Sequence, residues 1–182
     1  MYTKQNDLLL SKLLQFYGNS DFKELDRILK ILNGDSVISL RILDWFVTNY
    51  AKQRYVVYNL KNAERFKVYV DYKLKLKAYS KKRFDPFCRW DKIVIPYRTS
   101  QLIQTTIGQL NFFKWVIEND ILEFIERNYD VIEDDMNKRN STSKIKLETG
   151  TEGKTRKKRE ELSKSATKSI KKEALTIDID FS

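Results

Sequence analysis

Histidine is absent from this chain of 182 residues, and Cys88 is its only cysteine. Without histidine, neither a Ser-His-Asp nor a Cys-His nucleophile can form, and the commonest protein ligand for transition metals is missing. A single thiol excludes an intrachain disulfide and a zinc site built from cysteines, and the lack of disulfides suits a reducing compartment. We therefore expect no cofactor and no metal, and we interpret Cys88 as a small core residue.

Glycine, with 5 residues, and proline, with 2, are also scarce, whereas hydrophobic residues make up 41% of the chain. This composition predicts a real core with few long loops. No run approaches the ~20 apolar residues of a membrane helix, and Leu8–Leu14 is interrupted by Ser11 and Lys12, so it does not resemble a secretion signal. We therefore expect no membrane partner and no secretion.

Positive charge is concentrated in two blocks. Residues 61–98 contain 12 Lys and Arg against 4 Asp and Glu, and residues 137–172 contain 13 against 4. Residues 99–136 between them contain 2 Lys and Arg against 8 Asp and Glu. This distribution indicates a polyanionic partner more directly than the net charge of +10 does.

Helical periodicity predicts three helices in the first 52 residues. Asn6 and Ser20 are expected to cap the first two of these helices. The third, which is expected to open at residue 35 or 36 and to end near Ala51, is apolar around most of its circumference. A helix of this kind is predicted to lie at the centre of the domain.

The hydrophobic period then changes from 3.6 to 2. Residues 55–58 have the composition of a strand, and residues 66–78 alternate apolar side chains with lysines and tyrosines. The two segments predict a hairpin that pairs 55–60 with 66–78 and has a basic outer face. Residues 93–95, followed by Pro96, predict a third strand.

Thr106 opens a capping-box sequence, which predicts helix to about Met136 with a break at Asn119 and Asp120. Residues 137–172 contain no aromatic residue and many charged ones, and so predict a disordered or loosely helical arm. The last ten residues alternate apolar and polar side chains and predict a strand. The expected domains are a globular α+β domain at 1–136, a basic arm at 137–172 and a C-terminal strand at 173–182.

A basic strand face interleaved with tyrosines suits nucleic-acid binding, because lysines neutralise phosphates and exposed rings stack on unpaired bases. The alternative is a solvated strand whose lysines prevent edge aggregation. The candidate binding residues of this first block are Lys67, Tyr69, Lys73, Lys75, Lys77, Tyr79, Lys81, Lys82, Arg83 and Arg89. The tail adds a run with the composition of a nuclear-import signal or a nucleic-acid-binding arm, for which a solubilising role is the alternative. Its candidates are Lys154, Arg156, Lys157, Lys158 and Arg159.

Other motifs favour simpler interpretations. The segment after Thr106 is not predicted to be a helix-turn-helix, because its break is short and its second half is acidic. We interpret this half as a surface that docks the basic tail or is simply solvated. Asp71, with Lys73 and Glu64, suggests a metal-dependent nuclease, but such spacing is common by chance, so we predict no enzymatic activity. Residues 84–87 predict a turn in which Asp85 forms a local hydrogen bond.

Four segments carry a family resemblance. They are ISLRILDWFVTNY at 38–50, LKAYSKKRFDPFCR at 76–89, GQLNFFKWVIE at 108–118 and ELSKSATK at 161–168. In these blocks the chain resembles a group of uncharacterised proteins of nucleocytoplasmic large DNA viruses, the giant viruses and their relatives. The resemblance implies no activity and no functional residue. It implies a setting: the viral factory in the cytoplasm of an infected cell, the nucleus, or the virion core.

The sequence as a whole predicts an α+β fold with an N-terminal helical layer, a small antiparallel sheet, C-terminal helices and a basic tail that ends in a strand. The predicted function is a non-enzymatic protein that binds DNA or RNA during packaging, replication or transcription of a large viral genome. The alternative is a virion structural or assembly protein. In that case the tail and terminal strand would contact a second copy or another viral protein.

Overall fold

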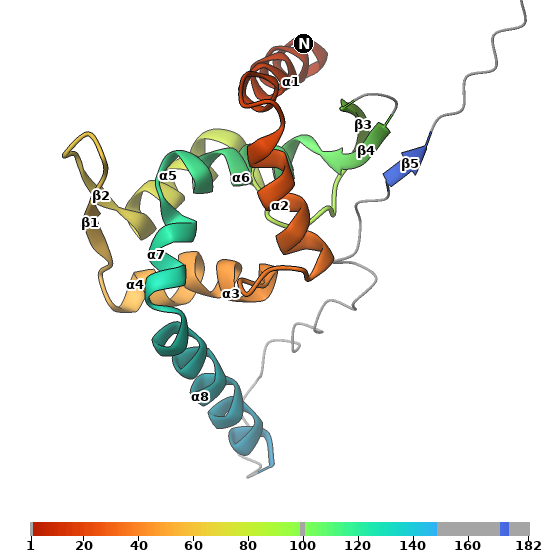
Figure 1. Ribbon diagram of the computed structural model, residues 1–182. Helices are drawn as coiled ribbons and strands as arrows, with labels where there is room; N and C mark the ends of the chain where they lie inside the picture. Colours follow the sequence, from red (N-terminus) through yellow and green to blue (C-terminus); the bar gives the residue numbers. More distant parts are fainter. Residues whose placement is uncertain (1, 99–100, 149–171, 175–182) are drawn as a thin grey trace, which may run out of the picture.

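The computed structural model describes residues 2–98, 101–148 and 172–174, with side chains from 5 to 98 and from 101 to 139. The predicted α+β class is confirmed: helices enclose the core, and two small sheets lie on opposite sides of it (Figure 1). The elements follow in the order α1 (Tyr2–Asn19), α2 (Lys23–Asn33), α3 (Leu40–Trp45), η1 (Phe46–Tyr50), α4 (Ala51–Gln53), β1 (Val57–Asn59), β2 (Arg65–Lys67), α5 (Val68–Arg83), β3 (Lys92–Tyr97), β4 (Gln101–Thr106), α6 (Ile107–Glu118), α7 (Ile121–Arg127), α8 (Tyr129–Glu148) and β5 (Lys172–Ala174).

The N-terminal helices are present, but the predicted caps are wrong. Helix α1 begins before Asn6, so Asn6 lies inside it. The Ser20 hydroxyl does not cap α2; it donates a hydrogen bond to the Tyr17 carbonyl at 3.0 Å. Phe22 instead occupies the position before α2 with φ of 58°, and its ring packs edge-on against Tyr97. Packing of this ring, rather than capping, therefore sets the turn between the two helices.

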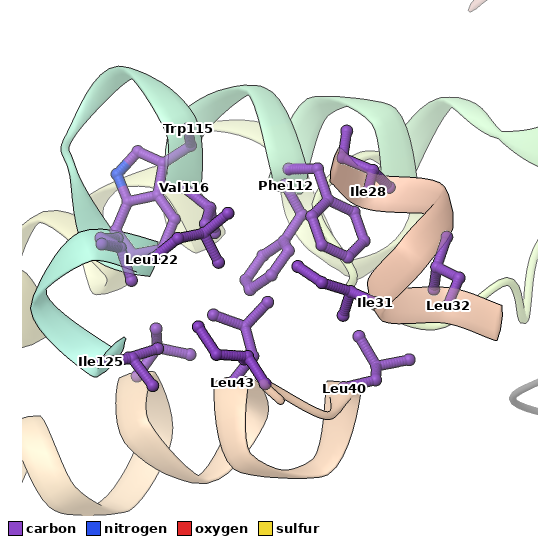
Figure 2. Close-up of a cluster of buried hydrophobic side chains, with 14 of the residues drawn as sticks. Ile28, Ile31, Leu32, Leu40, Leu43, Phe112, Trp115, Val116, Leu122 and Ile125 are labelled. Atoms are coloured by element: carbon purple, nitrogen blue, oxygen red, sulfur yellow. The ribbon is translucent and has the colours of Figure 1, made fainter. Parts of the chain in front are cut away.

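The third predicted helix is present, but it is not buried all round: Leu43 and Phe46 are buried, whereas Arg41 is exposed. It begins at Leu40 rather than at residue 35 or 36, because the Ser39 hydroxyl caps it by accepting a hydrogen bond from the Ile42 backbone N–H at 3.2 Å. Helices α3 and α4 continue into each other through the π-helical segment η1. Figure 2 shows Leu40 and Leu43 of α3 facing apolar side chains of α2, α6 and α7 across the core.

The predicted strand over residues 66–78 is wrong. Strand β2 ends at Lys67, and residues 68–83 form helix α5. In a helix, side chains three or four positions apart share a face, so Val68, Tyr72 and Tyr79 pack towards the core. The strand-like alternation leaves Val70 and Leu74 exposed on the other side. Because its apolar residues are spread around the helix, α5 has no helical period in the sequence.

The sheets are smaller than predicted or built differently. Strands β1 and β2 form a short antiparallel hairpin with Val57 opposite Lys67. Strand β3 confirms the strand predicted at residues 93–95, and it pairs with β4, which was not predicted. Strand β5 adds antiparallel to β4, with Ala174 opposite Gln101. Residues 175–182, which were predicted to continue the terminal strand, lie outside the described residues.

The C-terminal helices follow the prediction in part, because an unpredicted second break at Asn128 separates α7 from α8. The Thr106 hydroxyl caps α6 by accepting a hydrogen bond from the Gln109 backbone N–H at 3.1 Å. The break at Asn119 and Asp120 is confirmed, with Asp120 at φ of 51°. Helix α8 continues past Met136 to Glu148, so the first part of the predicted arm is helical.

Helix α6 touches α5 and the turn after it at very close range. A Cβ atom on Gly108 would lie 2.9 Å from the backbone oxygen of Lys82. We predict that Gly108→Ala lowers the free energy of unfolding by about 1–3 kcal/mol, because a backbone atom must move to make room. The matched control is Gly18→Ala in α1, where a Cβ atom meets nothing within 4 Å. Urea denaturation of both variants checks this, and equal stabilities would contradict the close approach.

Tyr17 ties α1 to α6: its hydroxyl donates a hydrogen bond to the Leu110 carbonyl at 2.7 Å. Burial raises the pKa of Tyr17 well above its ordinary value, since the charged form is poorly solvated. The neutral phenol therefore contributes stability that is complete below pH ~10 and is lost as the pH rises through the raised pKa. We predict that Tyr17→Phe costs about 1 kcal/mol at neutral pH. In urea titrations at pH about 11, the free energies of unfolding of the wild type and Tyr17→Phe should differ less than at neutral pH. The same difference at both pH values would contradict a raised pKa of Tyr17.

Candidate nucleic-acid interface

The outer face of α5 carries lysines one helical turn apart. Lys73 and Lys77 are both exposed there, and Lys81 and Lys82 follow, again exposed, after a kink in the helix. Among the described residues, no carboxylate forms an ion pair with any of these four side chains. We call these four lysines the basic surface.

The kink that separates the two pairs of lysines is at Ser80. Its backbone has φ of 58° and ψ of 169°, a conformation that glycine adopts freely and other residues rarely adopt. The helix therefore stops its regular course at Tyr79, and the turn from Lys81 to Arg83 takes a new direction towards the loop at 84–91.

The predicted sharing of one face by Lys73, Lys75 and Lys77 is wrong. Residues two apart lie on the same side of a strand but on opposite sides of a helix, about 200° apart. Lys75 is accordingly half-buried on the side away from the other two. Lys67 is exposed, but it belongs to β2 and precedes the helix.

The two tyrosines expected as free stacking rings are half-buried instead. The Tyr79 ring stacks on Phe84, with ring centroids 6.3 Å apart. The Tyr69 ring packs against the core, and the Lys52 Nζ atom lies 5.8 Å from its centroid. Both rings anchor α5 to the domain, so the faces they could offer to bases are largely covered.

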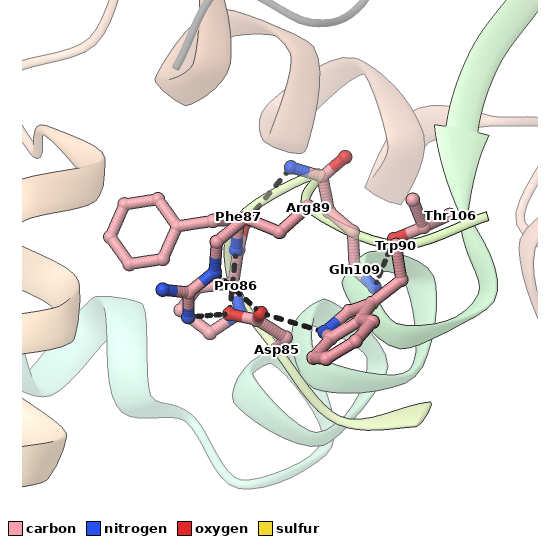
Figure 3. A network of polar contacts seen from close by, with 7 residues as sticks. All are labelled: Asp85, Pro86, Phe87, Arg89, Trp90, Thr106 and Gln109. Atoms are coloured by element: carbon pink, nitrogen blue, oxygen red, sulfur yellow. Dashed lines mark hydrogen bonds and ion pairs between the residues drawn. The ribbon is translucent and has the colours of Figure 1, made fainter. Parts of the chain in front are cut away.

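The loop after α5 is organised around a buried carboxylate. Asp85 is 2% exposed. Its Oδ1 atom accepts a hydrogen bond from the Phe87 backbone N–H at 3.2 Å, which confirms the predicted local bond in this turn. Figure 3 shows Arg89 and Trp90 approaching the same carboxylate from opposite sides. The Arg89 Nε and Nη2 atoms donate to it at 2.8 Å each, and the Trp90 indole N–H donates at 3.2 Å.

Arg89 is therefore committed to the loop, although it was predicted to bind nucleic acid. The hydrogen bond to Asp85 raises its pKa, and its guanidinium lies 4.9 Å from the Phe87 ring centroid. Arg83 has a similar internal role. Its backbone oxygen accepts a hydrogen bond from the Asn111 amide at 2.8 Å, and its guanidinium donates to Gln5 at 3.3 Å.

Trp90 is the residue that the candidate set missed. The residue as a whole is 37% exposed, and the Lys82 Nζ atom lies 5.8 Å from the centroid of its ring. The indole is thus an exposed aromatic surface beside the basic surface, held by its hydrogen bond to Asp85. No local pattern around Trp90 in the sequence signals this role, because its approach to Lys82 depends on the path of the loop.

The loop is also fastened to the start of α6. The Gln109 side chain is 1% exposed; its amide donates to the Pro86 carbonyl at 2.9 Å and its oxygen accepts from the Thr105 hydroxyl at 3.0 Å. The Asp85 backbone N–H donates to the Gly108 carbonyl at 3.2 Å. These bonds position the loop, and hence Trp90, on a buried helix.

The acidic helices α7 and α8 do not cover the basic surface within the described residues. Their carboxylates pair with other cations: Glu123 with Arg27 at 2.8 Å, and Asp135 with Arg139 at 3.1 Å. Lys61 pairs with Asp120 before α7, and this hydrogen bond raises the pKa of Lys61. The cations of the basic surface are therefore left available to an external polyanion.

Asp71, the centre of the nuclease hypothesis, has a different partner. Its Oδ1 atom accepts a hydrogen bond from the Trp115 indole N–H at 2.6 Å, which fixes α5 against α6. In the described ranges, no three acidic or cysteine side chains lie close enough together to hold a metal ion. Helices long and apolar enough to span a bilayer are likewise absent from the described part of the chain. The tail candidates from Lys154 to Arg159 lie outside it.

The fold and the surface define an α+β protein with a cationic helix face and an adjacent aromatic loop. Residues 1–152 match DUF7197, a family of unknown function, and the chain belongs to this family. The matched segment includes α1 to α8 and ends before the basic run at 154–159.

The chain is also similar to an uncharacterized protein of Acanthamoeba polyphaga mimivirus. The two are 41% identical over 153 residues, which cover 80% of this chain and 59% of that protein. The chain therefore spans 59% of the length of this curated relative. No solved structure matches the chain. The resemblance to an uncharacterised family of giant-virus proteins is confirmed.

Proposed function

We propose that this protein binds nucleic acid through the basic surface, without catalysing a reaction. The observation that carries this proposal is the set of four exposed lysines, Lys73, Lys77, Lys81 and Lys82, which pair with no carboxylate of the described residues. Unpaired ammonium groups gathered on one helix and its extension attract a phosphate backbone and displace its counterions.

Internal ion pairs elsewhere in the domain support the same conclusion. Arg27, Lys61 and Arg89 each have a carboxylate within 2.8 Å, so they serve the fold and are poorly placed to bind phosphate. These three side chains thus differ from the four lysines of the basic surface, which have no carboxylate partner among the described residues and so can bind phosphate. Binding through lysine ammonium groups is mainly directed to the backbone, and so is salt-sensitive and weakly dependent on sequence.

The setting of the family suits this activity. A relative occurs in a giant virus, which must package, replicate and transcribe a large DNA genome. We propose that the protein acts in one of these processes, in the cytoplasmic viral factory, the nucleus or the virion core. The basic run at 154–159 would add a second contact to the same polyanion.

A triple variant tests the basic surface. We predict that Lys73→Gln, Lys77→Gln and Lys81→Gln together weaken binding to duplex DNA and lower the salt slope by roughly 0.9 for each phosphate that the variant no longer neutralises. The matched control changes three exposed lysines on α1 and α2, Lys12, Lys23 and Lys30, to glutamine, with the same decrease in net charge. Filter binding across a salt series measures both slopes. Equal slopes in the two triple variants would remove these lysines from the interface.

A role in assembly is the second candidate, and two observations favour it. Strand β5 adds to the edge of β4, so the C-terminal part of the chain is able to extend a sheet. The α5 face also exposes Val70 at 54% and Leu74 at 59%, and both line a shallow groove of about 590 Å³ together with Lys73 and Lys77. In an assembly, the same strand addition would join one copy to the next.

The two candidates respond differently to one substitution. If strand addition drives assembly, we predict that Glu173→Pro, placed opposite Leu102, abolishes self-association in light scattering and leaves DNA affinity unchanged. The matched control is Glu173→Thr, which keeps the backbone N–H. Monomers at all concentrations in both the wild type and Glu173→Pro would rule out assembly through this strand.

A further inference from the structure

We infer that the ligand of the basic surface is single-stranded nucleic acid, with a base stacked on Trp90. This inference rests on the proposed function and adds the strandedness of the ligand. Its basis is the position of one aromatic ring. Among the described residues, Trp90 is the exposed tryptophan that lies within cation–π range of a lysine of the basic surface.

The ring is held in place before any ligand arrives. Its indole N–H donates to Asp85, whose carboxylate is fixed in turn by two bonds from Arg89 and one from the Phe87 backbone (Figure 3). The loop that carries the ring is bonded to α6 through Gln109. A rigid ring loses little conformational entropy when a flat ligand stacks on it, so stacking retains more of its free energy.

The chemistry beside the ring matches a nucleotide. The Lys82 ammonium group, 5.8 Å from the indole centroid, offers a phosphate contact next to a stacking surface. Lys81 and then Lys77 and Lys73 continue the positive charge away from the ring, along the chain of α5. A strand that stacks one base on Trp90 therefore meets further ammonium groups with its backbone.

Duplex nucleic acid does not satisfy the same site. In a double helix the faces of the bases are covered by their neighbours, whereas the bases of a single strand can be splayed onto an aromatic ring. Lysines alone do not distinguish the two forms, because both present phosphates. The ring is thus the feature that selects the unpaired strand.

The experiment uses the full-length chain and three labelled ligands of about 20 nucleotides each: oligothymidylate, an abasic strand of equal charge, and a duplex. Fluorescence anisotropy at near-physiological salt gives the affinities. We expect oligothymidylate to bind roughly 5- to 150-fold more tightly than the abasic strand, the range for one stacked base. Trp90→Ala should remove this difference, with no change in affinity for the abasic strand.

Two further variants keep the result interpretable. Trp90→Phe retains a ring but loses the indole N–H bond to Asp85 that holds it, and so should preserve only part of the preference. Tyr55→Ala removes another exposed ring, 85% exposed and outside the loop, and should have no effect on it. Circular dichroism spectra establish that each variant is folded. If Trp90→Ala does not fold, Trp90→Ser and Trp90→Leu replace it. The variant that folds must then lose the preference for oligothymidylate over the abasic strand.

The outcomes separate the two proposals. Equal affinity of the wild type for oligothymidylate and the abasic strand, or an unchanged preference in Trp90→Ala, overturns the role of Trp90 while nucleic-acid binding stands. Tighter binding of the duplex overturns the single-strand preference. Failure to bind any of the three ligands overturns the proposed function itself and favours a protein partner for this surface.

Discussion

The close packing of α6 at the centre of the domain is the constraint on which the rest of the structure depends. Leu110, Phe112, Phe113 and Val116 of this helix are each no more than 2% exposed. Figure 2 shows Phe112 and Val116 facing apolar side chains of α2, α3 and α7. Burial of this many large apolar side chains is the main favourable term of folding. The helices that pack against α6 therefore have their positions set by it. The other elements are positioned by their contacts with these helices.

Polar contacts to α6 determine where the surface loop lies. Thr106 caps the helix, and Gln109 in its first turn reaches the Pro86 carbonyl. Gly108 allows the Lys82 backbone to approach, which brings the end of α5 against the start of α6. Buried polar groups must be paired to be tolerated, so these bonds specify one arrangement of the loop. The position of Trp90 beside the basic surface is a consequence of that arrangement.

The separation of charge has its own structural cause. Glu123 of α7 and Asp135 of α8 face the helical layer, where Arg27 and Arg54 meet them. Lys73 and Lys77 of α5 face outwards, away from the rings that hold this helix to the core. One part of the domain is thus neutralised internally, while another keeps its positive charge. The domain therefore has a positively charged surface on α5, although the chain contains acidic and basic residues throughout.

Local signals in the sequence determined much of the fold. The α+β class, the third helix, the N-cap at Thr106 and the break at Asp120 all follow from hydrophobic period and capping chemistry. These features are set by residues close to one another in the chain. The Asp85 turn belongs with them, because its Oδ1 bond to Phe87 is local. The concentration of lysines in residues 61–98 was equally plain from the sequence.

Tertiary structure alone decided what α5 is and what it presents. The alternation over residues 66–78 matches a strand, yet the segment gains more by burying Val68, Tyr72 and Tyr79 as a helix against α6. That choice moves Lys75 away from the outer lysines of α5 and covers the tyrosines. It also brings Lys82 to Trp90. In this segment, contacts between distant parts of the chain outweigh the local preference for a strand. Such contacts cannot be recognised from the pattern of neighbouring residues in the sequence.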